Sequence, residues 1–195
     1  MNDSRILFAG LGNPGNSYVY TRHNVGFRVI DYIAQKESLD VSKKSFDALW
    51  GQLNTSVGNI ILLKPQTFMN LSGRSVRSIA SFYKIPAERI VIVCDDFALP
   101  IGTIRLRKEG SDGGHNGLAN IIQELSCKNF NRLRIGVGPL PQGASSVDFV
   151  LSKFSKIENE FLDKTIIPKT AEALMFFAAN DAERTMNTYN TSYES

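Results

Sequence analysis

The feature that most constrains the fold is the alternation of short apolar runs with longer segments of helical apolar spacing. Runs typical of strands occupy residues 5–9, 60–63, 90–94, 103–106 and 133–137, with a further candidate at 48–53. Helical patterns occupy residues 24–37, 72–83, 116–125 and the region from about 157 onward, where Pro168 marks a break or a new start. This alternation predicts an α/β fold.

Length and composition favour a single domain. The chain has 195 residues, of which 43% are hydrophobic, which is enough for one well-buried core. No internal repeat, low-complexity segment or linker interrupts it. We therefore expect residues 1–185 to form one domain and the polar residues 186–195 to form a frayed tail.

Charge and cysteine usage restrict the class of protein only weakly. A net charge of +3 does not by itself indicate a nucleic-acid partner. Cys94 and Cys127 are too few for a disulfide framework and are expected to be reduced thiols. No apolar run approaches the roughly 18 residues of a membrane span, so we expect a soluble, cytoplasmic protein.

The segment GLGNPG at residues 10–15 matches the glycine pattern of dinucleotide-binding loops. However, no helix follows directly, because the helical pattern begins only near Asn24, a plausible N-cap, and Pro14 removes one backbone N–H from the loop. These departures argue against NAD binding. A simple Gly/Pro turn explains the glycines, but not the crowding of polar side chains between residues 13 and 24.

Polar clusters follow the predicted strands. They are GNPG at residues 12–15, KPQTFMNLSG at 64–73 and DDFALPIG at 95–102, while GSDGGHNGL at 110–118 lies between a strand and a helix. Ligands of α/β sheets bind beyond the carboxyl ends of strands. The four loops are therefore expected to meet at one cleft.

His23 and His115 are the only histidines of the chain, and each is followed by asparagine in a polar loop. Histidine is the commonest general base, although a purely structural histidine is the simpler alternative. Asp95 ends an apolar run and is the best candidate to orient such a base, with a turn or helix cap as its alternative role. Strand alternation places Asp96 on the opposite side of the sheet.

A nucleophilic side chain is disfavoured. No G-x-S-x-G elbow occurs, and Cys94 is the one thiol near the expected site. Burial is the more common role for such a cysteine, and the neighbouring carboxylate of Asp95 would raise the pKa of Cys94 rather than lower it.

A water molecule activated by His23 could instead attack a carbonyl carbon, and it would attack an ester more readily than an amide. Asn13, Asn70 and Asn116 lie in the candidate loops and could donate hydrogen bonds to a peptide or an oxyanion without titrating. The alternative is that asparagine is simply common in turns.

Arginines alternate at strand spacing in two places. Arg105 and Arg107 are expected to share one face, and Arg132 and Arg134 another. Either pair could be an ordinary solvated surface. Next to a polar site, such pairs could bind phosphates.

The motifs GLGNPGNSYVYTRHNVGF, KPQTFMNLSG, CDDFALPIGTIRLRKEGSDGGHNGL and RLRIGVG resemble, in order and spacing, the signature segments of bacterial peptidyl-tRNA hydrolases. The resemblance covers most of the first 155 residues. It implies a monomeric single-domain α/β/α enzyme with three layers and a twisted mixed sheet. It also implies that the enzyme cleaves the ester between a peptide and the 3′-terminal ribose of tRNA without metal or cofactor.

The resemblance also implies roles for individual residues. His23 matches the general base of the family, and Asp95 matches the carboxylate that orients it. Asn13 and Asn70 match asparagines that position the peptide and the reacting ester. In this resemblance, the glycines of GLGNPG allow the backbone to approach a peptide ester rather than a pyrophosphate.

Further positions match the substrate site of the family. His115 and Asn116 match a second His-Asn pair that belongs to the substrate-binding site, and Tyr18 matches a cleft tyrosine. Arg107 and Arg134 match a basic pair that holds the 5′-phosphate of tRNA.

Two departures and one alternative function stand beside this resemblance. Ala98 replaces a common aspartate, and Pro139-Leu140-Pro141 replaces a Gly-Pro stretch, which puts loop shape and tRNA contacts in doubt. Relatives of this fold also serve as non-catalytic RNA-binding splicing partners. Fold alone does not distinguish the two functions, but the presence of His23, Asp95, Asn13 and Asn70 together favours the enzyme.

Overall fold

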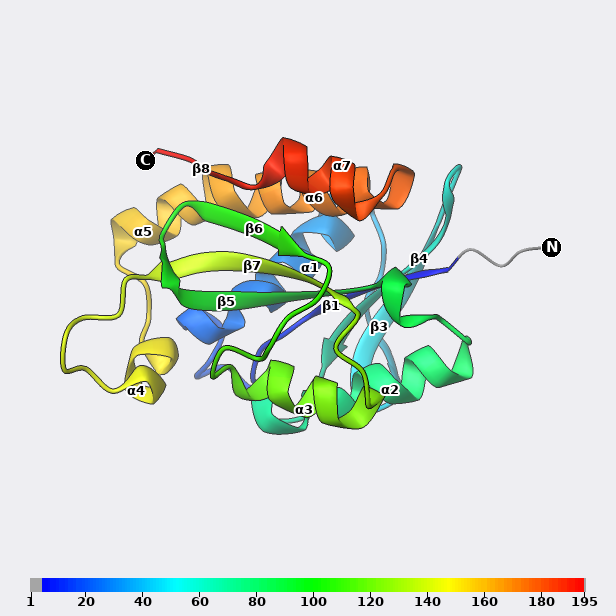
Figure 1. Cartoon of the computed structure of the whole chain (residues 1–195), viewed down its shortest axis with the longest axis horizontal. Coiled ribbons are helices and arrows are strands. Elements are labelled where there is room, and N and C mark those ends of the chain that lie inside the picture. Colours follow the sequence, from blue (N-terminus) through cyan, green and yellow to red (C-terminus); the bar gives the residue numbers. More distant parts are fainter. Residues whose placement is uncertain (1–4, 195) are drawn as a thin grey trace.

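An eight-stranded mixed sheet runs through the middle of the molecule (Figure 1). The computed structural model describes residues 5–194; residues 1–4 of the expected domain and Ser195 of the expected tail lie outside the described residues. The strand order is β2 (Lys43–Ser45), β3 (Ala48–Thr55), β4 (Gly58–Pro65), β1 (Ile6–Gly10), β5 (Ile90–Pro100), β7 (Asn131–Gly138), β6 (Thr103–Arg107) and β8 (Thr191–Ser192). The four inner strands β4, β1, β5 and β7 are parallel, and the flanking strands are antiparallel.

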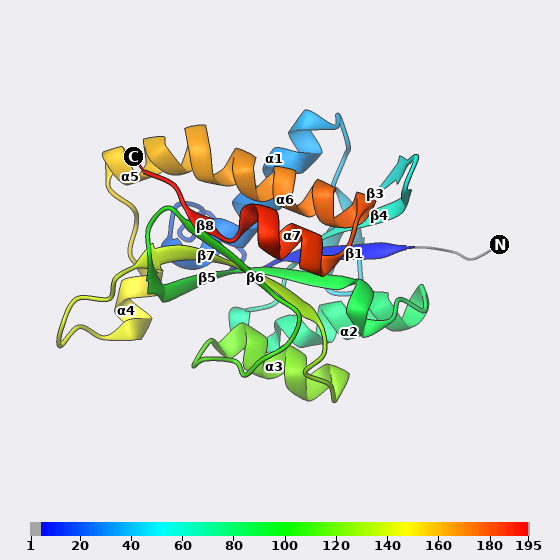
Figure 2. The ribbon, with the colours of Figure 1, turned by 45° about the horizontal axis from the view of Figure 1, so that its top comes forward.

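Helices cover both faces of the sheet (Figure 2). One layer contains α1 (Val25–Lys36), α5 (Lys156–Phe161) and α6 (Ile167–Ala179), and the other contains α2 (Ser72–Phe82) and α3 (Asn116–Leu125). Strand alternation divides the core accordingly, because Phe8 packs toward the first layer and Leu7 toward the second. The predicted three-layer α/β fold is confirmed.

The remaining elements are short. Three 3₁₀ turns span Arg22–Asn24, Met69–Leu71 and Ala87–Arg89, and α4 spans Ser146–Leu151. A π-helical turn over Leu162–Ile166 joins α5 to α6, which starts again at Ile167. Pro168 is the second residue of α6 and lies just after this turn, so the helix changes its hydrogen-bond pattern next to the proline but does not break. Among the described residues, none of the helices is long and apolar enough to cross a membrane.

The expected frayed tail differs from the structure. Residues 186–189 complete α7 (Ala182–Tyr189), and Thr191–Ser192 form β8 at the edge of β6. The Tyr193 amide donates to the Gly102 carbonyl at 3.0 Å, and the Asn190 side chain bonds to both backbone groups of Leu106. Met186, Tyr189 and Tyr193 also pack against the core, so the segment is held by both polar and apolar contacts.

Two glycines bring α1 against the ends of the central strands. A Cβ atom on Gly10 would lie 2.2 Å from the Gly26 carbonyl oxygen, and one on Gly26 would lie 2.4 Å from the Val93 carbonyl oxygen. Real Cβ atoms do not approach so closely, so both positions require glycine. Gly10 of the GLGNPG segment therefore allows the close packing of α1. The expectation was that this glycine would allow the backbone to approach a substrate.

Candidate active site

Loops from different parts of the chain meet at the carboxyl ends of the parallel strands. Residues 11–24 follow β1 and residues 66–71 follow β4, as expected for this kind of sheet. Residues 108–115 follow β6, which is antiparallel to β7 and therefore ends beside the amino end of β7, at the opposite end of the sheet from the cleft. This loop returns to the cleft, and Arg134 donates to its Ser111 carbonyl at 3.1 Å.

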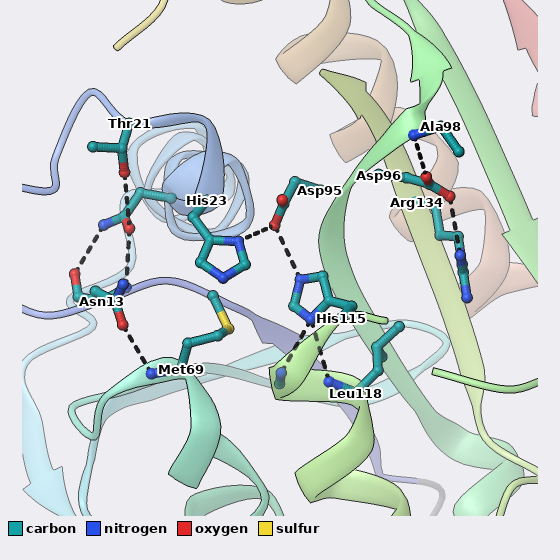
Figure 3. A network of polar contacts seen from close by, with 12 residues as sticks. Asn13, Thr21, His23, Met69, Asp95, Asp96, Ala98, His115, Leu118 and Arg134 are labelled. Carbon is teal, nitrogen blue, oxygen red and sulfur yellow. Dashed lines mark hydrogen bonds and ion pairs between the residues drawn. The ribbon is translucent and has the colours of Figure 1, made fainter. Parts of the chain in front are cut away.

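His23 and Asp95 form a buried pair (Figure 3). His23 lies in the 3₁₀ turn before α1, and its Nδ1 is 2.7 Å from Asp95 Oδ1. Asp95 is inside β5 rather than at its end, because β5 continues to pair with β7 beyond it. With Nδ1–H donating to the carboxylate, the lone pair of His23 Nε2 is available to accept a proton.

His115 bonds to the same carboxylate from the other side of the cleft. Its Nε2 is 3.0 Å from Asp95 Oδ1, while its Nδ1 accepts the backbone N–H groups of Gly117 at 3.1 Å and Leu118 at 3.3 Å. His115 is therefore the N-cap of α3. The prediction of a loop histidine is thus refined, because the side chain is tied into the start of a helix.

The electrostatics of Asp95 and Cys94 differ sharply. Burial alone would raise the pKa of Asp95, but the two imidazoles that face and bond to it hold its pKa well below the usual range. Burial, together with the adjacent Asp95 carboxylate, raises the pKa of Cys94 far above that of a free thiol. Asp95 is therefore ionised at neutral pH, and Cys94 is an inert buried thiol.

Asn13 is oriented by its neighbours. Its Oδ1 accepts the Met69 N–H at 2.8 Å, which leaves the Nδ2 amide group without a hydrogen bond among the residues that the structure describes. Its backbone N–H and C=O both bond to the Asn24 side chain, at 2.9 Å each. The Nδ2 donor of Asn13 is thus available to a ligand in the cleft.

Asn24 occupies the predicted N-cap position of α1, but its side chain makes a different set of bonds from those of a cap. The first turn of α1 contains no side-chain cap bond, and the Asn24 amide instead clamps the loop that contains Asn13. Sequence reasoning missed this clamp. The crowding of polar residues between 13 and 24 was the only signal of it.

A cleft of about 360 Å³ brings most of the predicted site residues together. Its walls contain Asn13, Tyr18, His23, Asn70 and Asn116. Asp95 and His115 line an adjoining hollow that shares His23 and Asn116 with the cleft. A larger cavity of about 610 Å³ lies between Ile6 and Phe177, but it contains none of the predicted site residues. We therefore identify the smaller cleft as the candidate active site, because it contains the polar side chains that the reaction would need.

The strand register corrects the predicted arrangement of the arginines. Arg105 lies opposite Arg134, and Arg107 lies opposite Arg132. Directly opposed residues of an antiparallel pair point to the same side, so all four lie on one face rather than on two. Arg105 and Arg107 are exposed, whereas Arg132 is buried and donates to the carbonyls of its surrounding loops.

Arg134 is partly occupied by a protein carboxylate. Its Nη1 is 3.0 Å from Asp96 Oδ2, while Asp96 Oδ1 accepts the Ala98 N–H at 2.9 Å (Figure 3). Asp95 and Asp96 point to opposite sides of β5, as predicted. The two departures from the family pattern are neighbours here, since the Leu140 N–H donates to the Phe97 carbonyl at 3.3 Å.

His23, Asp95 and His115 could be considered as metal ligands, because their donor atoms lie within 4.8 Å of one another. A metal on His115 Nε2 would require the proton of that ring to be on Nδ1. There it would oppose the N–H groups of Gly117 and Leu118. The hydrogen bonds thus fit a proton-transfer site better than a metal site, and the lack of a metal stays a prediction.

Comparison with known proteins places the chain in a family. The family model described as "Peptidyl-tRNA hydrolase" matches residues 7–195. The peptidyl-tRNA hydrolase of Clostridium perfringens strain 13 is 46% identical over 185 residues, which cover 95% of this chain and 97% of that protein. That of Thermoanaerobacter sp. strain X514 is 47% identical over 184 residues, covering 94% and 98%. This chain belongs to the peptidyl-tRNA hydrolase family.

The fold agrees with this family. The crystal structure of the peptidyl-tRNA hydrolase from Acinetobacter baumannii superposes with a TM-score of 0.89 at 34% identity, covering 97% of this chain and 96% of that one. The predictions of the family and of an enzyme are confirmed. Nothing in these comparisons supports the alternative of a non-catalytic RNA-binding splicing partner.

Sequence reasoning also missed how the 3₁₀ turn that contains His23 is anchored. Arg22, next to His23, bonds to Glu158 at 2.9 Å and to the Lys153 carbonyl at 2.6 Å. Its guanidinium carbon lies 4.7 Å from the ring centroids of both Phe149 and Phe154. These partners are more than a hundred residues away, so no local pattern could indicate them.

Proposed function

We propose that this protein hydrolyses the ester bond between a peptide and the 3′-terminal ribose of tRNA, with His23 as the general base and Asp95 as its orienting carboxylate. The observation that carries the assignment is the 2.7 Å contact from His23 Nδ1 to Asp95 Oδ1 inside the cleft. It directs the proton-accepting nitrogen of His23 toward bound water and substrate.

The reaction proceeds in two steps. His23 Nε2 takes a proton from water as the water oxygen bonds to the ester carbon, which forms a tetrahedral oxyanion. This intermediate collapses, the bond to the ribose 3′-oxygen breaks, and the proton on His23 passes to that oxygen. Asp95 stabilises the imidazolium between the two steps. The products are tRNA with a free 3′-hydroxyl and a peptide with a free carboxylic acid, which then loses its proton to solvent.

The asparagines of the cleft supply hydrogen bonds to the substrate. The free Nδ2 group of Asn13 donates to the ester carbonyl or to the oxyanion that develops from it. Asn70 and Asn116 are exposed on the cleft walls, where they bind the peptide backbone. The exposed apolar side chains of Phe68 and Val147 at the same cleft suit the side chains of a peptide, with Tyr18 beside them.

Phosphates of tRNA bind on the arginine face. Arg107 and Arg134 are diagonal neighbours on β6 and β7, a spacing of about 7–8 Å that one phosphate can bridge. Arg107 is exposed, and Arg134 would exchange its contact with Asp96 for one with phosphate. The cytoplasmic location, the monomeric state and the lack of any cofactor stay predictions.

Substitution of the base tests this function. We expect His23→Ala to lower the single-turnover rate on peptidyl-tRNA by about 10²- to 10⁴-fold, the contribution of a general base. Affinity for tRNA and the melting temperature should stay close to wild type, because the ring makes only one hydrogen bond among the described residues. Near-normal turnover in this variant would remove His23 from the mechanism.

A further inference from the structure

Both ring nitrogens of His115 are already engaged by the protein. Nδ1 faces two backbone N–H groups at the start of α3, and Nε2 faces the Asp95 carboxylate. The side chain is only 9% exposed. No polar atom of the ring is left for a substrate.

The partners determine which nitrogen of His115 is protonated. A backbone N–H can only donate, so Nδ1 must present a lone pair to Gly117 and Leu118. The ring proton is then on Nε2, where it is donated to Asp95. His23 has the reverse arrangement, because its Nδ1 faces the same carboxylate oxygen.

We propose that His115 is a positioning residue, which α3 holds in the Nε2–H tautomer so that it fixes Asp95 for His23, and that it does not contact the substrate. This rests on the proposed function, and it replaces the substrate-binding role that the family resemblance implies for His115. Two donors, at 2.7 and 3.0 Å, meet at one carboxylate oxygen and hold it between the rings.

Two ionisable groups face the His115 ring, namely Asp95 from β5 and His23 from the 3₁₀ turn, whose ring centroid is 4.9 Å away. The partial positive charge of the α3 N-terminus lies against Nδ1. The Gly117 backbone lies close to the ring as well, since a Cβ atom on Gly117 would be 3.1 Å from His115 Cε1. The ring is therefore held between β5 and the start of α3.

The tautomers can be observed directly, because the chain contains only two histidines. We would record nitrogen-15 spectra of the imidazoles in the whole protein at pH 8, with His23→Ala to identify the signals. We expect an Nε2–H ring for His115 and an Nδ1–H ring for His23. The same tautomer in both, or a doubly protonated His115, would overturn the proposal. This readout does not depend on hydrolysis, so its failure is distinguishable from failure of the proposed function.

Kinetics provide the second test. Asn at position 115 can still cap α3 but is too short to reach Asp95. We expect His115→Asn to lower kcat by about 10- to 100-fold, as for loss of one hydrogen bond to a charged group, and to leave KM for peptidyl-tRNA nearly unchanged. Asn116→Ala, the neighbouring control, should raise KM. A raised KM with unchanged kcat in His115→Asn would show that His115 contacts the substrate.

Discussion

At the scale of single residues, Asp95 is the side chain on which the site depends most. It is 3% exposed and bonds to both histidines through one oxygen. Its ionised carboxylate is the hydrogen-bond acceptor that the two rings share. Replacing this charge therefore tests the mechanism without removing the bulk of the side chain.

We expect Asp95→Asn to reduce kcat steeply, because a neutral amide can stabilise the wrong tautomer of His23 and cannot stabilise its imidazolium. Cys94→Ser is the neighbouring control and should keep the wild-type rate. An inactive Cys94→Ser with a trapped peptidyl-thioester on the wild type would refute the water mechanism.

Asp95 also links stability to pH. Its folded-state pKa lies below the usual range, whereas the unfolded chain takes up this proton near pH 3.9. Below that pH the unfolded state therefore binds more protons at Asp95 than the folded state, and acid favours unfolding by up to about 1.4 kcal/mol per pH unit. We would measure the free energy of unfolding in urea at several pH values between about 4.5 and 2.5. This free energy should fall more steeply with decreasing pH for wild type than for Asp95→Asn. Parallel losses would contradict the assignment.

At the scale of elements, the contact of α1 with the central strands positions the 3₁₀ turn that contains His23. Gly26 lies one turn of helix from His23, and its Cα faces the backbone of Leu11 and Val93. No flexible side chain separates them. The position of His23 thus depends on how closely this helix approaches the sheet.

We expect Gly26→Ala to lower the free energy of unfolding by about 1–3 kcal/mol, because the new methyl group would meet backbone atoms that cannot move aside. Activity should fall as well, since His23 would shift with the helix. Gln35→Ala, an exposed position on the same helix, should change stability by less than about 0.5 kcal/mol. Denaturant titration and turnover assays compare the two, and equal stabilities would show that α1 can move away.

At the scale of the whole molecule, the candidate cleft and the arginine face lie on different parts of one sheet. Asp95 serves the cleft, and the next residue, Asp96, pairs with Arg134 on the other side of β5. Substrate recognition and bond cleavage are therefore expected to be separable by mutation.

We expect Arg107→Gln with Arg134→Gln to weaken tRNA binding and to reduce the log–log salt slope by about 0.7–0.9 per lost phosphate contact. Hydrolysis of a minimal peptidyl ester should hardly change. Lys164→Gln with Arg184→Gln removes the same charge from exposed positions in the opposite helical layer and is the matched control. Equal losses on both substrates would mean that the arginines shape the cleft instead.

Local pattern was sufficient for much of this protein. The alternation of strands and helices follows from periodicity within short windows, so the α/β class and the approximate ranges of the inner strands and main helices were predictable. The motif residues His23, Asn13 and Asn70 were identifiable because they stand in polar segments between apolar runs, and Asp95 because it directly follows the apolar run 90–94. Side-chain alternation was also enough to separate Asp95 from Asp96.

Contacts between distant residues decided the rest. The shared face of the arginines depends on strand register, and the ordered tail depends on a free edge of β6 that only the assembled sheet provides. The Asn24 clamp and the opposite tautomers of the two histidines depend on donors and acceptors that approach within about 3 Å only after folding. A sequence specifies which groups can bond, but which of them meet is decided by the packing of the whole chain.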